Sequence, residues 1–270
     1  MEKNNYSVLI STCDKFSDLW DANVLLINEN WADRNADTYL VTDKPSDRTF
    51  SQVKLIAGGE GAEITERLQV VLREIDTPYI VFTLDDYFLT EKIDTAAIQK
   101  DIAFMAQNDI DYLRIYPCGK KRLRQVKAVK SDTPGIYFRD PNEGDYAISL
   151  YPGIWKADFM RKTLGEVRNA WQYEVALTGM ARDLKARLAV SENREFPFLD
   201  VIRKGKLLRK AKRYFDKNPI YQSEREVMKA KDEWMLSFRT VLRTWLPAPL
   251  MRALKNRMRK KGHTFFSDGQ

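Results

Sequence analysis

Residues 79–88 read Tyr-Ile-Val-Phe-Thr-Leu-Asp-Asp-Tyr-Phe, and this stretch decides how the rest of the sequence is interpreted. Its first six residues are mostly apolar and include β-branched and aromatic side chains, which predicts a buried strand. Two adjacent carboxylates, Asp85 and Asp86, follow where that strand should end. Ligands of open α/β sheets bind beyond the carboxyl ends of the strands, and an acid pair there is costly unless a cation or hydrogen-bond donors stabilise its charge. The pair therefore indicates a bound ion, sugar or phosphate, and a solvated turn is the alternative.

The remaining periodicity predicts strands that alternate with helices. Strands are expected at 6–12, 38–42, 53–57 and 111–116, and helices at 19–27, 66–75 and 96–108. Such alternation predicts an α/β fold whose doubly wound, mostly parallel sheet is flanked by helices.

Three further segments have less regular patterns. The Gly58-Gly59-Glu60-Gly61 cluster could cradle a phosphate, but it lacks the P-loop ending and the dinucleotide spacing, so a plain turn is favoured. Residues 118–145 are rich in charged residues, Gly and Pro, which predicts a loop or hairpin over the site. Residues 146–156 are expected to form a short strand, a Pro-Gly turn and a tryptophan, Trp155, that opens a helix.

Glu174 is an acid among aromatic residues, in the sequence Trp171-Gln172-Tyr173-Glu174. Aromatic faces suit the apolar side of a sugar ring, and partly apolar surroundings raise the pKa of a carboxyl group toward that of a useful base. The alternative is a core helix with a capping glutamate.

The composition excludes several classes of protein. The 270 residues are 44% hydrophobic and 31% charged, as in an ordinary globular protein. Two cysteines, Cys13 and Cys118, make a disulfide framework improbable and suit a reducing cytoplasm. The lone histidine, His263, argues against histidine-based catalysis and a His-rich zinc site. Neither a signal peptide nor an apolar run of about 20 residues is seen.

The charge is distributed unevenly along the chain. Residues 200–270 hold 19 Lys and Arg against 7 Asp and Glu, a net charge of +12, whereas residues 1–199 carry −5. The basic part has two apolar stripes at helical spacing, which comprise Leu207, Leu208, Ala211, Tyr214 and Phe215, and then Leu250, Met251, Leu254 and Met258. Basic amphipathic helices bind anionic membranes. Alternatively, the stripes pack on the rest of the protein.

The order of these motifs resembles bacterial glycosyltransferase-like proteins of capsule and lipopolysaccharide synthesis, which have the GT-A fold. The matching features lie within residues 6–178: Ser-Thr-Cys-Asp after the first strand, an arginine on the helix before the acid strand, Leu-Asp-Asp-Tyr-Phe-Leu, Ser-Leu-x-Pro-Gly-Ile-Trp and Trp-Gln-Tyr-Glu. The resemblance implies a nucleotide-sugar-binding catalytic domain over residues 1–200, followed by a basic amphipathic helical tail over residues 201–270.

The resemblance also implies roles for single residues. It places Cys13 and Asp14 near the nucleotide base and ribose, and Arg67 near the donor diphosphate. Asp85 and Asp86 stand where a GT-A enzyme has Asp-x-Asp, although here Tyr87 occupies the position of the second acid. Asp86 would bind Mg²⁺ or Mn²⁺ through oxygen ligands, or Arg67 and nearby lysines would neutralise the diphosphate instead.

These expectations describe an inverting glycosyltransferase that moves a sugar from a nucleotide-sugar donor to a hydroxyl of a surface polysaccharide or glycolipid. Glu174 is the expected general base, with Asp86 as the second candidate. The enzyme is expected in the cytoplasm, on the inner face of the bacterial membrane. Two alternatives stay open: a non-catalytic nucleic-acid-binding protein that uses the basic tail, and a metal-dependent phosphotransferase or nucleotidyltransferase.

Overall fold

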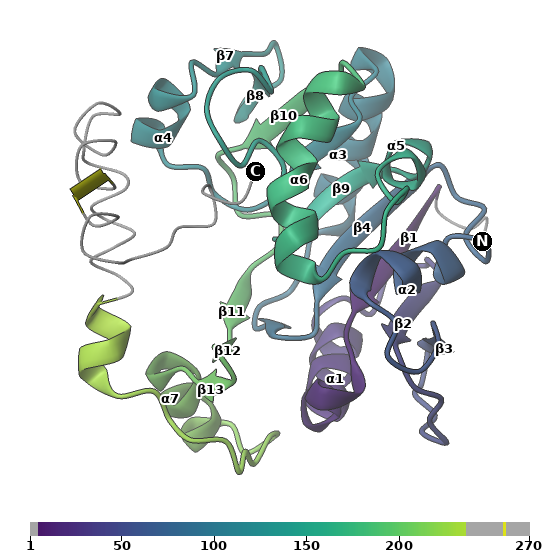
Figure 1. Cartoon of the computed structure of the whole chain (residues 1–270), viewed down its shortest axis with the longest axis vertical. Helices are drawn as coiled ribbons and strands as arrows, with labels where there is room; N and C mark the ends of the chain where they lie inside the picture. The colour runs from purple at the N-terminus through teal and green to yellow at the C-terminus, as the bar shows by residue number, and fades with distance from the viewer. Residues whose placement is uncertain (1–4, 236–255, 258–270) are drawn as a thin grey trace.

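A mixed sheet forms the centre of the molecule. The computed structural model describes residues 5–235 and 256–257. Within them the sheet has nine strands (Figure 1), in the spatial order β3 (Lys54–Ala57), β2 (Thr38–Thr42), β1 (Tyr6–Ser11), β4 (Tyr79–Leu84), β9 (Gly153–Lys156), β6 (Tyr112–Arg114), β10 (Leu188–Ser191), β8 (Ile136–Arg139) and β7 (Val129–Lys130). Strands β3, β2, β1 and β4 are parallel. Within this sheet only β9 and β8 run against the direction of the other strands. The sheet is therefore mostly parallel, as predicted.

Helices cover both faces of this sheet (Figure 1). Helices α1 (Trp20–Asn30) and α3 (Thr95–Asn108) pack on one face, and α2 (Ile64–Val71), α5 (Ala157–Lys162) and α6 (Ala170–Asp183) pack on the other. The remaining helices, η1 (Asp14–Leu19), α4 (Lys120–Gln125) and α7 (Arg209–Lys217), belong to smaller clusters. Because side chains alternate along a strand, Val8 and Ile10 of β1 pack toward α1 and α3, whereas Leu9 packs toward α2, α5 and α6. The result is a three-layer α/β/α arrangement.

The prediction for residues 146–156 was wrong. Trp155 does not open a helix but lies in β9, where it is fully buried against Phe82 and Tyr112. Helix α5 begins only at Ala157. Strand β9 is inserted antiparallel between β4 and β6, with apolar neighbours on both faces, so it shows no alternation from which a strand could be recognised. The hairpin expected within residues 118–145 is present as β7 and β8, preceded by α4.

The residues after β10 pack against β5, η1 and α1. Strand β11 (Phe198–Asp200) pairs with β5 (Tyr87–Leu89), and β12 (Ile202–Arg203) pairs with β13 (Lys206–Leu207). Ala211 and Phe215 of α7 are buried in a cluster with Leu19, Ala22 and Phe88. The first apolar stripe therefore packs on the body of the protein, which is the alternative to membrane contact. The second stripe lies outside the described residues.

Candidate active site

The carboxyl ends of three parallel strands bring the predicted polar residues to one edge of the sheet. Thr12 and Cys13 follow β1, Asp43 follows β2, and the acid pair follows β4. Because Ser11 of β1 lies level with Leu84 of β4, the residues after each strand become neighbours. This edge is where open α/β sheets bind ligands.

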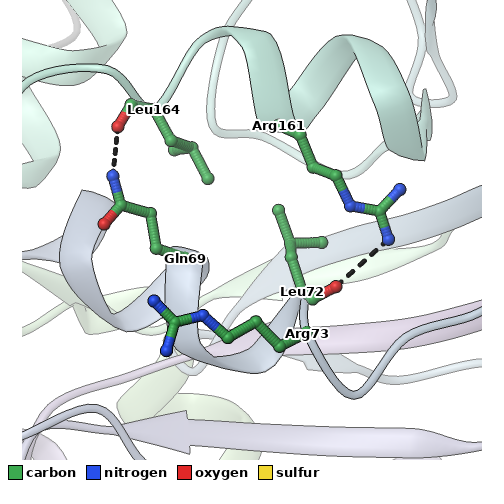
Figure 2. A pocket seen from close by; sticks show the side chains of 5 residues that line it. All are labelled: Gln69, Leu72, Arg73, Arg161 and Leu164. Carbon is green, nitrogen blue, oxygen red and sulfur yellow. Dashed lines mark hydrogen bonds between the residues drawn. The ribbon is translucent and has the colours of Figure 1, made fainter.

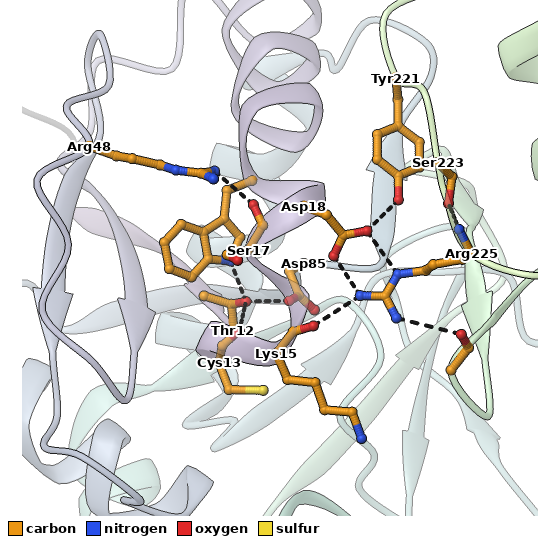
Figure 3. A network of polar contacts seen from close by, with 12 residues as sticks. Thr12, Cys13, Lys15, Ser17, Asp18, Arg48, Asp85, Tyr221, Ser223 and Arg225 are labelled. Carbon is orange, nitrogen blue, oxygen red and sulfur yellow. Dashed lines mark hydrogen bonds and ion pairs between the residues drawn. The ribbon is translucent and has the colours of Figure 1, made fainter.

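Asp85 is held in place by its surroundings. The Thr12 hydroxyl donates to Asp85 Oδ2, and Trp20 Nε1 donates to Thr12 Oγ1 over 2.7 Å (Figure 3). Asn23 Nδ2 donates to the Asp85 carbonyl oxygen over 3.0 Å. Only 6% of Asp85 is exposed, and this burial raises the pKa of its carboxyl group. Asp85 thus fixes the geometry of the strand end.

Asp86 is different, because one oxygen of its carboxylate is not engaged. Its Oδ1 is buried and has no hydrogen-bond partner among the described residues. Only its backbone is fixed, with the Val201 amide donating to the Asp86 carbonyl oxygen over 2.9 Å. Burial, followed by the charges of Asp85 and Asp200, raises the pKa of Asp86, and Arg203 opposes this shift. A buried carboxylate oxygen without a partner is costly, so Asp86 remains the candidate ligand-binding acid of the pair.

Asp200 and Arg203 belong to this site but were missed by the sequence reasoning. Strand β11 pairs with β5 so that Asp200 lies opposite Tyr87, directly after the acid pair. Arg203 donates to Asp200 Oδ2 and, over 3.4 Å, to the Tyr151 hydroxyl. Asp200 Oδ1, like Asp86 Oδ1, is buried without a partner in the described part of the chain. Two neighbouring carboxylates thus each present one free oxygen.

Glu174 enters the same site from α6. The N-terminus of α6 is capped by Asn169 and Gln172, so Glu174 is not a capping residue. Its Oε1 accepts the Leu150 amide over 3.1 Å. Burial raises the pKa of Glu174, whereas the Leu150 amide and the positive charge of Arg203 lower it. Leu150 precedes Tyr151, whose ring stacks on that of Tyr87, the residue after Asp86, so a short series of contacts links Glu174 to Asp86.

Cys13 and Asp14 follow β1, and Arg67 lies in α2. Burial and the charge of Asp85 raise the pKa of the Cys13 thiol, whereas Arg67 opposes this shift. The Asp14 amide donates to Asp43 Oδ1 over 2.6 Å. Arg67 of α2 is buried, donates to the Ala62 carbonyl oxygen, and has an Nε without a partner in the described residues. The positive charge of this buried guanidinium acts on Asp85 as well as on Cys13, and its helix, α2, packs beside α6, which carries Glu174.

The glycine cluster after β3 is a turn rather than a phosphate cradle. The amides of Gly58 and Gly59 donate to the carbonyl oxygens of Thr42 and Asp43, over 2.7 and 3.0 Å, and are not free for an anion. A Cβ on Gly58 would lie 2.7 Å from Arg67 Cα. Glycine at this position lets α2, and with it Arg67, approach the end of β3.

We expect Gly58→Ala to lower the free energy of unfolding by about 1–3 kcal/mol, because backbone atoms of α2 must move to make room. Chemical denaturation measures the effect. Gly179→Ala is the matched control, since a Cβ there meets nothing within 4 Å; that variant should be at least as stable as the wild type. Equal stability of Gly58→Ala and the wild type would contradict the packing of Arg67 over Gly58.

Residues near the C-terminus brace the loop that carries Cys13 and Asp14. Arg225 pairs with Asp18 of η1 and also donates to the Lys15 carbonyl oxygen over 3.0 Å (Figure 3). The Tyr221 hydroxyl donates to Asp18 Oδ2 over 2.6 Å. Burial raises the pKa of Asp18, but the hydrogen bonds from Arg225 and Tyr221 outweigh it, so the net shift is downward.

A double-mutant cycle of Asp18→Asn and Arg225→Ala should give a coupling of about 1 kcal/mol at neutral pH, typical of a half-exposed pair with good geometry. Because the folded pKa of Asp18 is lowered, this stabilisation is present above the unfolded pKa and is lost as the pH falls through the folded value. Urea denaturation at pH 7 and below about pH 3 tests both points. Additive effects at pH 7 would show that the pair does not brace the loop.

A pocket of about 190 Å³ lies away from these residues (Figure 2). Leu72 and Arg73 after α2, together with Arg161 of α5, are part of its lining. The chain enters α5 beside the start of β4, where Ala157 donates to the Pro78 carbonyl oxygen over 2.8 Å. The pocket is therefore at the amino end of β4, opposite to the acid pair.

No protein-family profile and no curated protein matches the sequence. Solved structures do match its fold. The mannosyltransferase PcManGT from Pyrobaculum calidifontis, in complex with GDP-Man and Mn²⁺, has a TM-score of 0.50 at 14% identity, over 76% of this chain and 59% of that chain. This chain has a GT-A-like fold.

Two further structures match less well. S. aureus TarS 1-349 has a TM-score of 0.45 at 15% identity, over 71% of this chain and 58% of that chain. CMP:2-keto-3-deoxy-manno-octonic acid synthetase complexed with CTP has a TM-score of 0.48 at 13% identity, over 74% of this chain and 93% of that chain. The chain thus spans about three fifths of the length of TarS 1-349 and of PcManGT. At these identities the similarity concerns the fold.

Proposed function

We propose that this protein is a nucleotide-sugar-dependent glycosyltransferase whose reaction takes place between Asp86 and Glu174. One observation carries the proposal: the free carboxylate oxygens of Asp86 and Asp200 lie at the ligand-binding edge of a GT-A-like sheet. Arg67 and Glu174 come from α2 and α6, which pack together on one face of that sheet. The chemistry of sugar transfer needs these three kinds of group together.

The donor is proposed to bind across the ends of β1, β2 and β4. Cys13 and Asp14 would contact the base and ribose, and Asp85 would hold the ribose or the sugar. Arg67 would bind the diphosphate, because its buried guanidinium has an unused Nε and a positive charge directed at this edge. A cation there stabilises the negative charge that develops when the sugar–diphosphate bond breaks.

The residues also fit a divalent cation. No group of three or more His, Cys, Asp or Glu side chains that could hold a metal is found in residues 5–235 and 256–257. Mg²⁺ and Mn²⁺ in such enzymes need only one or two carboxylates, however, because substrate phosphates supply further oxygens. Asp86, with the unpartnered Oδ1 of Asp200, provides that set. The ion would neutralise charge on the donor diphosphate.

Glu174 is proposed as the general base of an inverting transfer. The acceptor oxygen forms a bond to the anomeric carbon as the bond to the diphosphate breaks. The electron pair of the broken bond leaves with the diphosphate, and Glu174 takes the hydroxyl proton. A pKa raised by burial suits this task, since a base is most effective when its pKa approaches the working pH.

The cellular role is a further part of the proposal. The resemblance in the motifs suggests a polysaccharide or glycolipid acceptor at the inner face of the bacterial membrane. Among the described residues, no helix is long and apolar enough to cross a bilayer. Membrane contact would then depend on the charged face of α7 and on the basic residues beyond it.

A thermal-shift screen tests the proposal. The screen covers UDP, GDP, dTDP and CMP and the sugars of each nucleotide. One nucleotide and its sugars should raise the melting temperature, and more strongly with Mn²⁺ than without. Stabilisation by a nucleoside triphosphate, with pyrophosphate released when a sugar acid is added, would favour a nucleotidyltransferase. Stabilisation by duplex DNA or RNA alone would favour the nucleic-acid-binding alternative.

A further inference from the structure

Three arginines converge beside the proposed active site. They are Arg114 at the end of β6, Arg122 in α4 and Arg139 at the end of β8. The Nη2 atoms of Arg122 and Arg139 both donate to the Asp145 carbonyl oxygen, each over 3.1 Å. Arg139 is buried, with only 4% of its surface exposed. Burial lowers the pKa of Arg139 to about 10, and the positive charge of Arg122 adds to the effect.

None of these guanidinium groups is neutralised within the described residues. None of the three is within salt-bridge distance of a carboxylate there. The Nε atoms of Arg114 and Arg139 are buried and have no hydrogen-bond partner in the same part of the chain. Arg139 is buried and Arg114 and Arg122 are half-buried, and grouping like charges partly out of water is costly unless an anion compensates them. Arginine is also the side chain best shaped to bind phosphate or carboxylate through two hydrogen bonds.

The sheet register places this cluster near the acid pair. Arg114 of β6 lies level with Gly153 of β9, which lies level with Phe82 of β4. Residues paired across neighbouring strands point to the same face, and the strands are about 4.8 Å apart. The backbone of Arg114 is therefore roughly 10 Å from that of Phe82, three residues before Asp85.

A row of aromatic rings connects the cluster to the carboxylates. The Arg114 guanidinium lies 3.4 Å from the centre of the Tyr116 ring. Tyr116 stacks on Tyr151 at 4.8 Å, and Tyr151 stacks on Tyr87 at 5.1 Å, next to Asp86. Tyr87 is buried, whereas Tyr116 and Tyr151 are half-buried. Because these rings stack on one another, the ring edges of Tyr116 and Tyr151 are the parts left for a sugar to contact.

We propose that Arg114, Arg122 and Arg139 form an anion-binding subsite for the acceptor, which is an acidic saccharide carrying phosphate or carboxylate groups. That the bound saccharide is the acceptor rests on the proposed function, whereas the anion site itself does not depend on that function. An acidic group in the cluster would leave a neighbouring sugar unit along the edges of the Tyr116 and Tyr151 rings, with a hydroxyl directed toward Glu174.

Ligand-observed NMR titrations at constant ionic strength test the subsite, with glucose 6-phosphate, glucuronate and neutral glucose as probes. The wild type should bind one or both acidic sugars and not glucose, and the stronger of the two acids identifies the charged group. Arg114→Gln, Arg122→Gln and Arg139→Gln should each weaken that binding about tenfold, because hydrogen bonds to charged groups contribute about 1.5–3 kcal/mol. Arg124→Gln is the matched control, since Arg124 is an exposed arginine of the same helix.

The two arginine sites can be separated experimentally. Arg67→Gln should abolish the response to nucleotide sugars and leave glucose 6-phosphate binding unchanged. Arg114→Gln and Arg122→Gln should weaken glucose 6-phosphate binding about tenfold and leave the response to nucleotide sugars unchanged. The subsite is overturned if the wild type does not bind the acidic sugars, or if their binding is unchanged in all three cluster variants. Loss of acidic-sugar binding in Arg67→Gln also overturns it, because the anion would then occupy the donor site. Absence of any nucleotide-sugar response in the wild type contradicts the proposed function alone.

Discussion

Replacing Asp86 by Asn is expected to lower the transfer rate by at least about 10²-fold, the scale on which one electrostatic contact to a developing charge contributes to catalysis. The same substitution should leave the stability unchanged or raise it by about 1 kcal/mol. A buried carboxylate with a free oxygen costs the folded state energy, and the amide removes that charge. Activity assays and chemical denaturation on the same preparations measure both effects.

Asp85→Ala is the control for this prediction. Asp85 accepts a hydrogen bond from Thr12, so its removal leaves a buried hydroxyl without that acceptor. We expect a loss of about 1–3 kcal/mol in the free energy of unfolding. The opposite signs of the two stability changes would separate the acid that has a free buried oxygen from the acid whose side chain also supports the strand end. Full activity of Asp86→Asn would refute the site assignment.

Replacing Glu174 by Gln should lower kcat by about 10²–10⁴-fold, the contribution of a general base, without a change in affinity for the nucleotide sugar. Glutamine keeps an oxygen for the Leu150 amide, so the local structure should persist. Because burial raises the pKa of Glu174, the wild-type rate should rise with pH through a value above that of an ordinary glutamate. This dependence should be absent from the variant. If Glu174→Gln instead lost donor affinity as strongly as rate, Glu174 would be a binding or structural group.

Local pattern was enough to predict some of the site. The β4 stretch could be recognised because a run of apolar, β-branched residues ends abruptly in two acids, and both the strand and its position are confirmed. Glu174 was noticed because an acid stands among aromatic residues of a helix. In both cases the signal lies within a few consecutive residues.

Other features depend on contacts that the sequence does not encode locally. Asp200 reaches the acid pair only because β11 pairs antiparallel with β5, more than a hundred residues earlier. Arg203 was assigned to a basic tail, although its charge acts on Asp86 and Glu174. Likewise β9 is a short strand between β4 and β6, and Gly153 within it is required because a Cβ there would lie 2.7 Å from the Tyr112 ring. Short buried strands lack the alternation on which sequence reasoning depends.

The products formed from nucleotide sugars test the central claim most directly. The full chain should be incubated with Mn²⁺ and UDP-, GDP-, dTDP- and CMP-sugars, and the nucleotides separated by chromatography. One donor should be cleaved between the sugar and the phosphate, releasing the free nucleotide faster when an acidic saccharide acceptor is present and at least about 10²-fold more slowly with Asp86→Asn. Failure to cleave any of these donors, together with pyrophosphate release from a nucleoside triphosphate and a sugar acid, would contradict the account.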